Sequence, residues 1–269
     1  MSVRIFEAAS SAARLEAAAK FLRQFPVDHP ITILAATRGA ADDFARSIAS
    51  ERGATLGITR LSLTQLAART AVVAMAAEGK TPSSGLGAEA VAARAVFTAL
   101  RDQSLHYFAP VAGSPGFPRA LARTLQELRL ADVAASALHT ADRARADLAD
   151  LLTRFDAAFG DVAAADRAEL LHTASRLLRG RTVGGAVLLL DIAVHDAAEA
   201  ALIASLAAGA ADVLATVPRG DRPSIVRLAA LGADVEHGEE SGDGDLSSLR
   251  RYLFETELEP PQRTSDGSG

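Results

Sequence analysis

Cysteine is absent from the 269 residues of this chain, and lysine is almost absent. Without cysteine the chain has no disulfide, no thiolate zinc site, no Cys-ligated iron–sulfur cluster and no cysteine nucleophile. Lysine occurs only at Lys20 and Lys80, so arginine supplies 26 of the 28 basic residues.

Long uninterrupted apolar runs are also missing. The most apolar stretch, 183–217, contains five charged or titratable side chains: Asp191, His195, Asp196, Glu199 and Asp212. A membrane span tolerates few such residues, so we predict no membrane partner. The first twenty residues lack the apolar core of a signal peptide, and we expect a cytoplasmic protein.

The composition is that of a soluble globular protein, with 49% hydrophobic and 23% charged residues. The net charge of −5 is unevenly placed. Residues from 233 onward hold ten acidic side chains and three arginines, which leaves residues 1–232 with a charge of +2. The charge excludes a strongly basic nucleic-acid-binding domain, but it leaves room for a DNA-binding surface on the body.

Short apolar strands alternate with helices at both ends of the chain. Strands are expected at 3–8, 31–35 and 57–63, with helices at 11–25 and 40–51 between them. Residues 64–179 then predict helices alone. Strands return at 186–190, 213–217 and 234–236, with helices at 196–208, 223–232 and 246–254. The pattern predicts an α/β protein whose parallel sheet is interrupted by a helical insertion of domain size.

Nucleotide-binding signals are weak. The string 74–81 fits a relaxed phosphate loop, but a helix precedes it, so we interpret it as a helix C-terminus. The segment Ala8–Arg14 after the first strand has neither glycine nor lysine for a phosphate. Asp191 follows an apolar strand, which is where nucleotide hydrolases place a magnesium-binding carboxylate. The next residue in such enzymes is a catalytic acid, but here it is Ile192, so we favour a role for Asp191 in forming a turn. No His pair or Ser elbow is present. We predict no catalytic residue, cofactor or metal site.

Three arginines follow one predicted helix, Arg119, Arg123 and Arg129. Such a stripe can track a phosphate backbone. The competing interpretation, which we favour, is a solvated face whose arginines pair with acids such as Glu127.

The order of several segments resembles the N-terminal, helicase-like region of the B-subunit family of bacterial helicase–nucleases, whose members carry a PD-(D/E)XK nuclease at their far end. The similar segments are an apolar strand followed by Thr-Arg, a Thr-x-x-Leu-Ala-like segment, a Pro-Gly-Phe helix with Glu-Leu-Arg, and two shorter ones, at 31–38, 60–67, 115–130, 166–171 and 248–254. The resemblance covers about residues 3–255, although Ala36 replaces the family's proline.

This resemblance implies a RecA-like domain with a degenerate phosphate loop, formed by 1–63 and 181–255, with a helical insertion at 64–180 and a disordered tail at 256–269. It implies double-strand-break repair beside a partner subunit that drives unwinding with ATP. The chain holds no second helicase domain and no nuclease, so we expect a truncated form that neither hydrolyses ATP nor cuts DNA.

By the same resemblance, single-stranded DNA is expected near Thr37 and Arg38, with Thr64 and the arginines Arg119, Arg123 and Arg129 as further candidates. Two alternatives stay open. One is an α/β enzyme that binds a nucleotide or another small molecule at the strand ends. The other is a structural module that docks on a partner and contacts no ligand.

Overall fold

The computed structural model describes residues 2–82, 85–138 and 142–238 and divides the chain into two compact units. The α/β unit comprises the residues up to Leu66, Leu178–His195 and those from Ile203 onward. The helical unit comprises Ala67–Leu177 and Asp196–Leu202. The helix expected at 196–208 was assigned to the α/β domain, but its first residues, Asp196–Leu202, belong to the helical unit. The sequence did not indicate this division.

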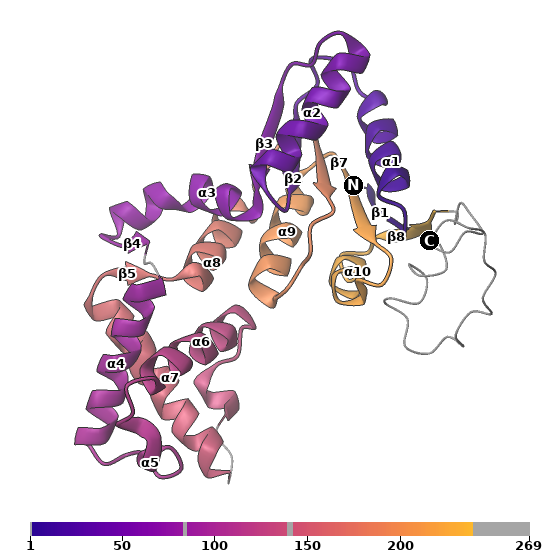
Figure 1. The fold of residues 1–269 in the computed structure, drawn as a ribbon. Helices are drawn as coiled ribbons and strands as arrows, with labels where there is room; N and C mark the ends of the chain where they lie inside the picture. The colour runs from indigo at the N-terminus through magenta and orange to yellow at the C-terminus, as the bar shows by residue number, and fades with distance from the viewer. Residues whose placement is uncertain (1, 83–84, 139–141, 239–269) are drawn as a thin grey trace, which may run out of the picture. The chain divides into compact units, whose positions relative to one another are not determined.

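The α/β unit is built on a six-stranded, all-parallel sheet in the order β3-β2-β6-β7-β1-β8 (Figure 1). The strands are β1 (Ser2–Ala8), β2 (Ile31–Ala35), β3 (Ile58–Ser62), β6 (Ala186–Leu190), β7 (Asp212–Pro218) and β8 (Asp234–His237). The predicted α/β class with a parallel sheet is confirmed. The strand β1 lies between β7 and β8, far from β2 in the sheet although β2 follows it in sequence.

Helices α1 (Ser11–Arg23) and α2 (Arg38–Arg52) pack on the same face of this sheet. Leu188 and Leu190 of β6 share a buried cluster with Phe21 of α1 and with Phe44 and Ile48 of α2. All five residues of β6 are buried, as expected of a parallel strand covered on both faces. Helix α10 (Arg222–Ala229) also belongs to this unit, as does most of α9 (Ala197–Gly209), which begins in the helical unit.

Capping side chains set two helix starts that the sequence pattern placed differently. The helix expected from residue 40 begins at Arg38, because Thr37 is its N-cap and its Oγ1 accepts from the Ala40 N–H at 3.2 Å. The strand expected to run to residue 63 ends at Ser62, which exchanges hydrogen bonds with Gln65 in a capping box. Both signals are present in the sequence as Thr-Arg-Gly-Ala and Ser-Leu-Thr-Gln.

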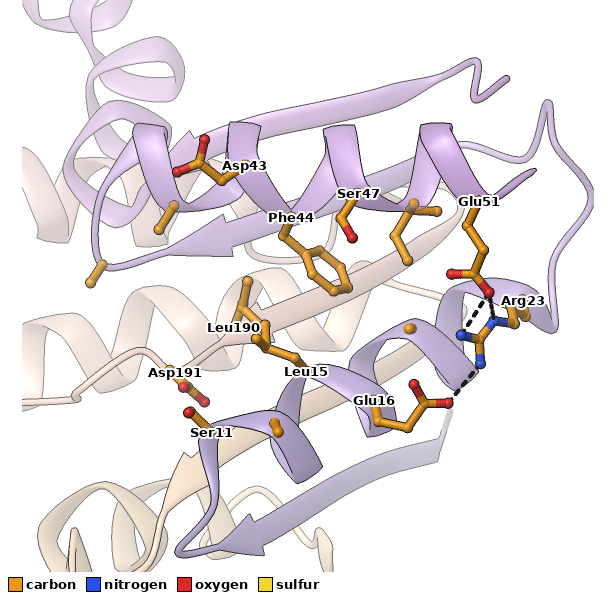
Figure 2. A pocket seen from close by; sticks show the side chains of 15 residues that line it. Ser11, Leu15, Glu16, Arg23, Asp43, Phe44, Ser47, Glu51, Leu190 and Asp191 are labelled. Atoms are coloured by element: carbon orange, nitrogen blue, oxygen red, sulfur yellow. Dashed lines mark hydrogen bonds and ion pairs between the residues drawn. The ribbon is translucent and has the colours of Figure 1, made fainter. Parts of the chain in front are cut away.

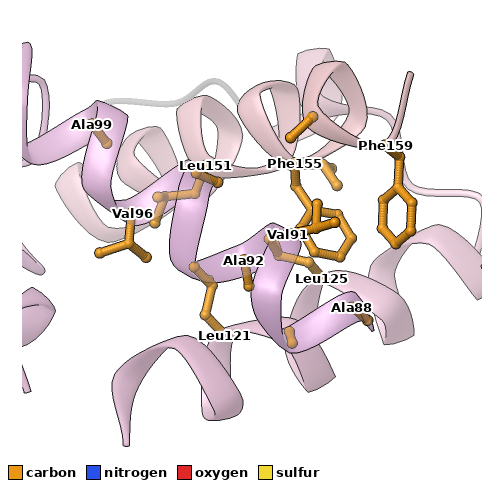
Figure 3. Close-up of a cluster of buried hydrophobic side chains, with 14 of the residues drawn as sticks. Ala88, Val91, Ala92, Val96, Ala99, Leu121, Leu125, Leu151, Phe155 and Phe159 are labelled. Carbon is orange, nitrogen blue, oxygen red and sulfur yellow. The ribbon is translucent and has the colours of Figure 1, made fainter. Parts of the chain in front are cut away.

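The helical unit has its core where α4 (Gly85–Arg101), α6 (Phe117–Leu130) and α7 (Arg143–Asp161) meet (Figure 3). Small residues on α4, such as Ala92 and Ala99, let the neighbouring helices approach, and Leu125 and Phe155 fill the space beside them. The unit also contains α5 (Ala109–Ala112), α8 (Arg167–Leu178), the 3-10 helix η1 (Ala135–Leu138) and most of α3 (Leu63–Ala77).

A two-stranded sheet joins segments where loops were expected. The strands β4 (Thr81–Pro82) and β5 (Ala164–Ala165) pair in parallel. The string 74–81 forms the end of α3, a turn with Gly79 at φ +74°, and the first residue of β4. Lys80 pairs with Glu169 and with Glu78, and the hydrogen bond that Lys80 donates to Glu169 is the main cause of its raised pKa. The helix-end interpretation of this string is confirmed.

Two expected segments, the helix 246–254 and the tail 256–269, lie outside the described residues. Across the ranges that are described, every helix falls short of the length and apolar character that crossing a bilayer requires.

Candidate functional site

The carboxyl ends of the strands in the α/β unit form the edge at which open parallel sheets bind their ligands. The chain leaves β1 after Ala8 and enters α1 at Ser11, and it leaves β2 after Ala35 and enters α2 at Arg38. Ser10 caps α1, where its Oγ accepts from the Ala13 N–H at 3.4 Å. Two helix N-termini therefore begin at this edge, each with its first N–H groups partly satisfied by a side chain.

A buried arginine fills the position where a phosphate loop would bind its anion. Arg14 of α1 donates from Nη1 to the carbonyl oxygens of Ala8 at 2.6 Å and Ala9 at 3.1 Å. Its Nε lies 3.0 and 3.1 Å from the two carboxylate oxygens of Asp191. A phosphate loop presents N–H groups to an anion, whereas this loop presents carbonyl oxygens to a cation.

Asp191 is held by β7 as well as by Arg14. Its Oδ1 accepts from the Thr216 Oγ1 at 2.7 Å, and its N–H donates to the Thr216 Oγ1 and carbonyl oxygen at 3.0 and 3.1 Å. The residue adopts a left-handed backbone with φ +48°, which aspartate tolerates in turns. The carboxylate is thus used within the protein, in agreement with the turn-forming role favoured from the sequence.

Metal-binding clusters are also absent from the described part of the chain, in which no three His, Asp or Glu side chains gather closely enough to hold an ion. The ion pair itself supplies a fixed positive charge beside Asp191. The arrangement at this edge can therefore hold the strand ends together, but it offers no cradle for a nucleotide phosphate.

The DNA-binding candidates of the α/β unit lie near this edge. Thr37 uses its hydroxyl in the α2 cap. Arg38 is 60% exposed, and its Nε lies 3.6 Å from Oδ2 of Asp42. The other carboxylate oxygen of Asp42, Oδ1, lies 3.4 Å from the Arg60 Nε. Thr64 is exposed in the first turn of α3. Arg38 thus offers an exposed cation at a helix N-terminus, held only by a surface ion pair of small energetic value.

The candidate arginines of the helical unit differ among themselves. Arg119 and Arg123 are exposed on α6, and Arg123 pairs with Glu127 at 3.1 Å, four residues along. Arg129 is mostly buried, with its Nε 2.8 Å from Asp166 and its guanidinium over the Phe159 ring. Only Arg119 and Arg123 remain open to solvent as the stripe interpretation requires.

Arg129 belongs instead to a partly buried charge network. It pairs with the half-exposed Asp156 and the buried Asp166, and the pKa of Asp156 is raised because its desolvation outweighs the lowering effect of Arg129. Asp166 in turn accepts from the Glu169 N–H at 3.0 Å and so caps α8. Because Arg129 ties α6 to α7 and α8, we assign it a structural role and replace the earlier DNA-binding prediction for this residue.

A groove between α1 and α2 and the ion pair of Arg14 were not anticipated from the sequence. Arg14 ended a glycine-free loop in the sequence, and Asp191 lies 177 residues away from it, so no local pattern links the two.

Neither models of known protein families nor curated protein sequences give a match to this chain.

Proposed function

We propose that this chain is a helicase-like scaffold without ATPase or nuclease activity, part of a helicase–nuclease subunit that repairs DNA double-strand breaks in the cytoplasm. In this proposal it binds single-stranded DNA weakly and without sequence preference, beside a partner subunit that supplies ATP-driven unwinding. The observation that supports the proposal is a parallel α/β sheet in which the loop after β1 directs carbonyl oxygens at Arg14, a cation paired with Asp191.

The DNA contact is supported by exposed cations in both units. Arg38 stands at the N-terminus of α2, where helix N–H groups and a guanidinium both favour a phosphate oxygen. Arg119 and Arg123 present positive charge on α6. The order of sequence segments that resembles the helicase–nuclease family supports the same role.

Anisotropy of a labelled single-stranded oligonucleotide, followed across a salt series, tests this proposal. We expect binding whose logarithmic dependence on salt has a slope of roughly 0.7 for each phosphate contacted. The double variant Arg38→Ala with Arg119→Ala should bind several-fold more weakly and lower the slope by about 1.4. Unchanged affinity and slope in that variant would remove both residues from the DNA site.

Thermal unfolding with ATP and magnesium tests the competing nucleotide enzyme. We expect no change in Tm at millimolar ATP, because a ligand that does not bind the folded state cannot stabilise it. A saturable rise in Tm that disappears in Asp191→Asn would instead support a nucleotide site at the strand ends. Copurification with a partner while single-stranded DNA fails to bind would favour the purely structural module.

A further inference from the structure

A groove runs between α1 and α2 over the end of β6 (Figure 2). Its volume is about 670 Å³, and all of its walls belong to the α/β unit. Leu190 and Ala36 lie at the floor, at the ends of β6 and β2. Because β6 lies between β2 and β7, α2 covers the sheet on one side of β6 and α1 on the other, which leaves the groove between the two helices.

The lining residues show that the groove is elongated. One face of α1 contributes Ser11, Leu15, Ala19 and Arg23, at intervals of four residues. The facing side of α2 contributes residues from Ala40 to Glu51. At 1.5 Å per residue, each wall is roughly 17 Å long, which is the length of about three helical turns.

The middle of the groove is apolar. Leu15 on α1 faces Phe44 on α2, with Leu190 between them (Figure 2), and Ile48 also lines the groove. Leu15 is 43% exposed, whereas Phe44, Ile48 and Leu190 are buried. An apolar side chain entering the groove would cover Leu15 and contact the other three, so the groove has room for the apolar face of a ligand.

The rim of the groove is acidic. Four carboxylates line it, namely Glu16, Asp43, Glu51 and Asp191, beside one guanidinium, that of Arg23. Asp191 is already paired with the buried Arg14, so the other three are the acids that a ligand can meet. Arg23 bridges the two walls at one end, 2.9 Å from Glu16 and 2.8 Å from Glu51. One guanidinium thus serves two carboxylates, and its hydrogen bond lowers the pKa of Glu16, which stays ionised at neutral pH.

The rim carboxylates also have exchangeable partners. Asp43 is 71% exposed and pairs with Arg46, which does not line the groove. Exposed ion pairs of this kind contribute little free energy, so a cationic ligand can compete for the carboxylates. A nucleic acid would meet repulsion here, since its phosphates would approach the same acidic side chains.

We propose that this groove binds the apolar face of a basic amphipathic helix, about three turns long, from a protein partner. The length of the groove suits a helix, its floor suits apolar side chains at helical spacing, and its rim suits lysine or arginine on either side. This inference rests on the scaffold role proposed above, but it is independent of the DNA contact, which we assign to other residues.

A labelled peptide of about 14 residues serves as the probe, with leucines at positions i, i+3, i+4 and i+7 of a helix and lysine or arginine elsewhere. A second peptide has the same leucines, with glutamate in place of every basic residue. We expect the basic peptide to bind the full chain, more weakly as salt rises, and the acidic peptide not to bind.

Two variants and two matched controls locate the binding. Leu15→Gln should weaken binding of the basic peptide about tenfold or more, and Asp43→Asn should weaken it by roughly two- to fivefold. Val226→Gln changes an apolar residue, 68% exposed, on α10, and Asp28→Asn removes an exposed acid from a loop. Neither control residue lines the groove, so both variants should bind as the unmodified chain does.

Several results would overturn the assignment. Equal binding of the two peptides would do so, as would full affinity in Leu15→Gln. Self-association of the chain that Leu15→Gln abolishes would show that a second copy occupies the groove. Failure of the DNA contact is distinguishable, because it would appear as an absence of oligonucleotide binding while the basic peptide still binds.

Discussion

Replacing Arg14 with alanine is expected to destabilise the α/β unit by about 2–3 kcal/mol. The change removes the charged partner of Asp191 and the side-chain donor to the carbonyl oxygens of Ala8 and Ala9, of which Ala8 keeps a second donor in the Arg219 N–H at 3.1 Å. The expected loss is smaller than for a fully buried ion pair, because the Asp191 side chain is 30% exposed and water can reach it. Urea unfolding measures the change, and amide hydrogen exchange on β6 and β7 localises it.

Arg46→Ala is the matched control for this prediction. Arg46 is 72% exposed and makes a surface ion pair, so its loss should change the stability by less than about 0.5 kcal/mol. Arg14→Lys keeps the charge but not the forked geometry and should fall between the two. If Arg14→Ala unfolded at the same urea concentration as Arg46→Ala, the pair would not be what holds the strand ends together.

Replacing Asp147 with alanine is expected to destabilise the helical unit by about 3 kcal/mol. Asp147 is 2% exposed, and its carboxylate accepts from three consecutive backbone N–H groups, those of His106, Tyr107 and Phe108, at 2.8–3.1 Å. Alanine would leave these donors without their acceptor, and water would have to enter the buried site of the carboxylate to replace it. Far-UV circular dichroism during urea unfolding measures the loss.

The exchange of the amides at 106–108 provides a local readout, since these hydrogens should exchange much faster in Asp147→Ala. Asp161→Ala is the matched control on the same helix, because the Asp161 side chain is 60% exposed and pairs only at the surface with Arg94. Equal stability of the two variants would contradict the role assigned to Asp147.

Local sequence signals predicted the parallel sheet well. The strands β2 and β6 are short, continuous apolar runs, and the helices that alternate with the strands are bounded by proline, glycine or capping residues. Each element could therefore be identified as a strand or a helix from neighbouring residues alone. The two short strands β4 and β5 could not be found in this way. Each has two residues, and their pairing depends on segments more than 80 residues apart.

The candidate site was harder to predict for the same reason. Asp191 was recognisable as a carboxylate at a strand end, but nothing near Arg14 indicated its role, and only the strand order brings the two residues together. Arg129 lies further along the helix that carries Arg119 and Arg123, and a helix face cannot be identified as exposed until its neighbours are placed. Asp156 and Asp166, which bind Arg129, come from segments that the arginine stripe did not include.

The position of β1 in the sheet has a consequence for how the chain is made. Among the described residues it pairs with β7 and β8, which begin at residues 212 and 234. At about 5–20 residues per second, a ribosome needs roughly 10–40 s to reach β7 after β1 has emerged. During this interval most of the helical unit, residues 67–177, has been synthesised and can fold while the apolar side chains of β1 lack their partners. The nascent chain is therefore most exposed to aggregation, and most in need of a chaperone, at its first strand.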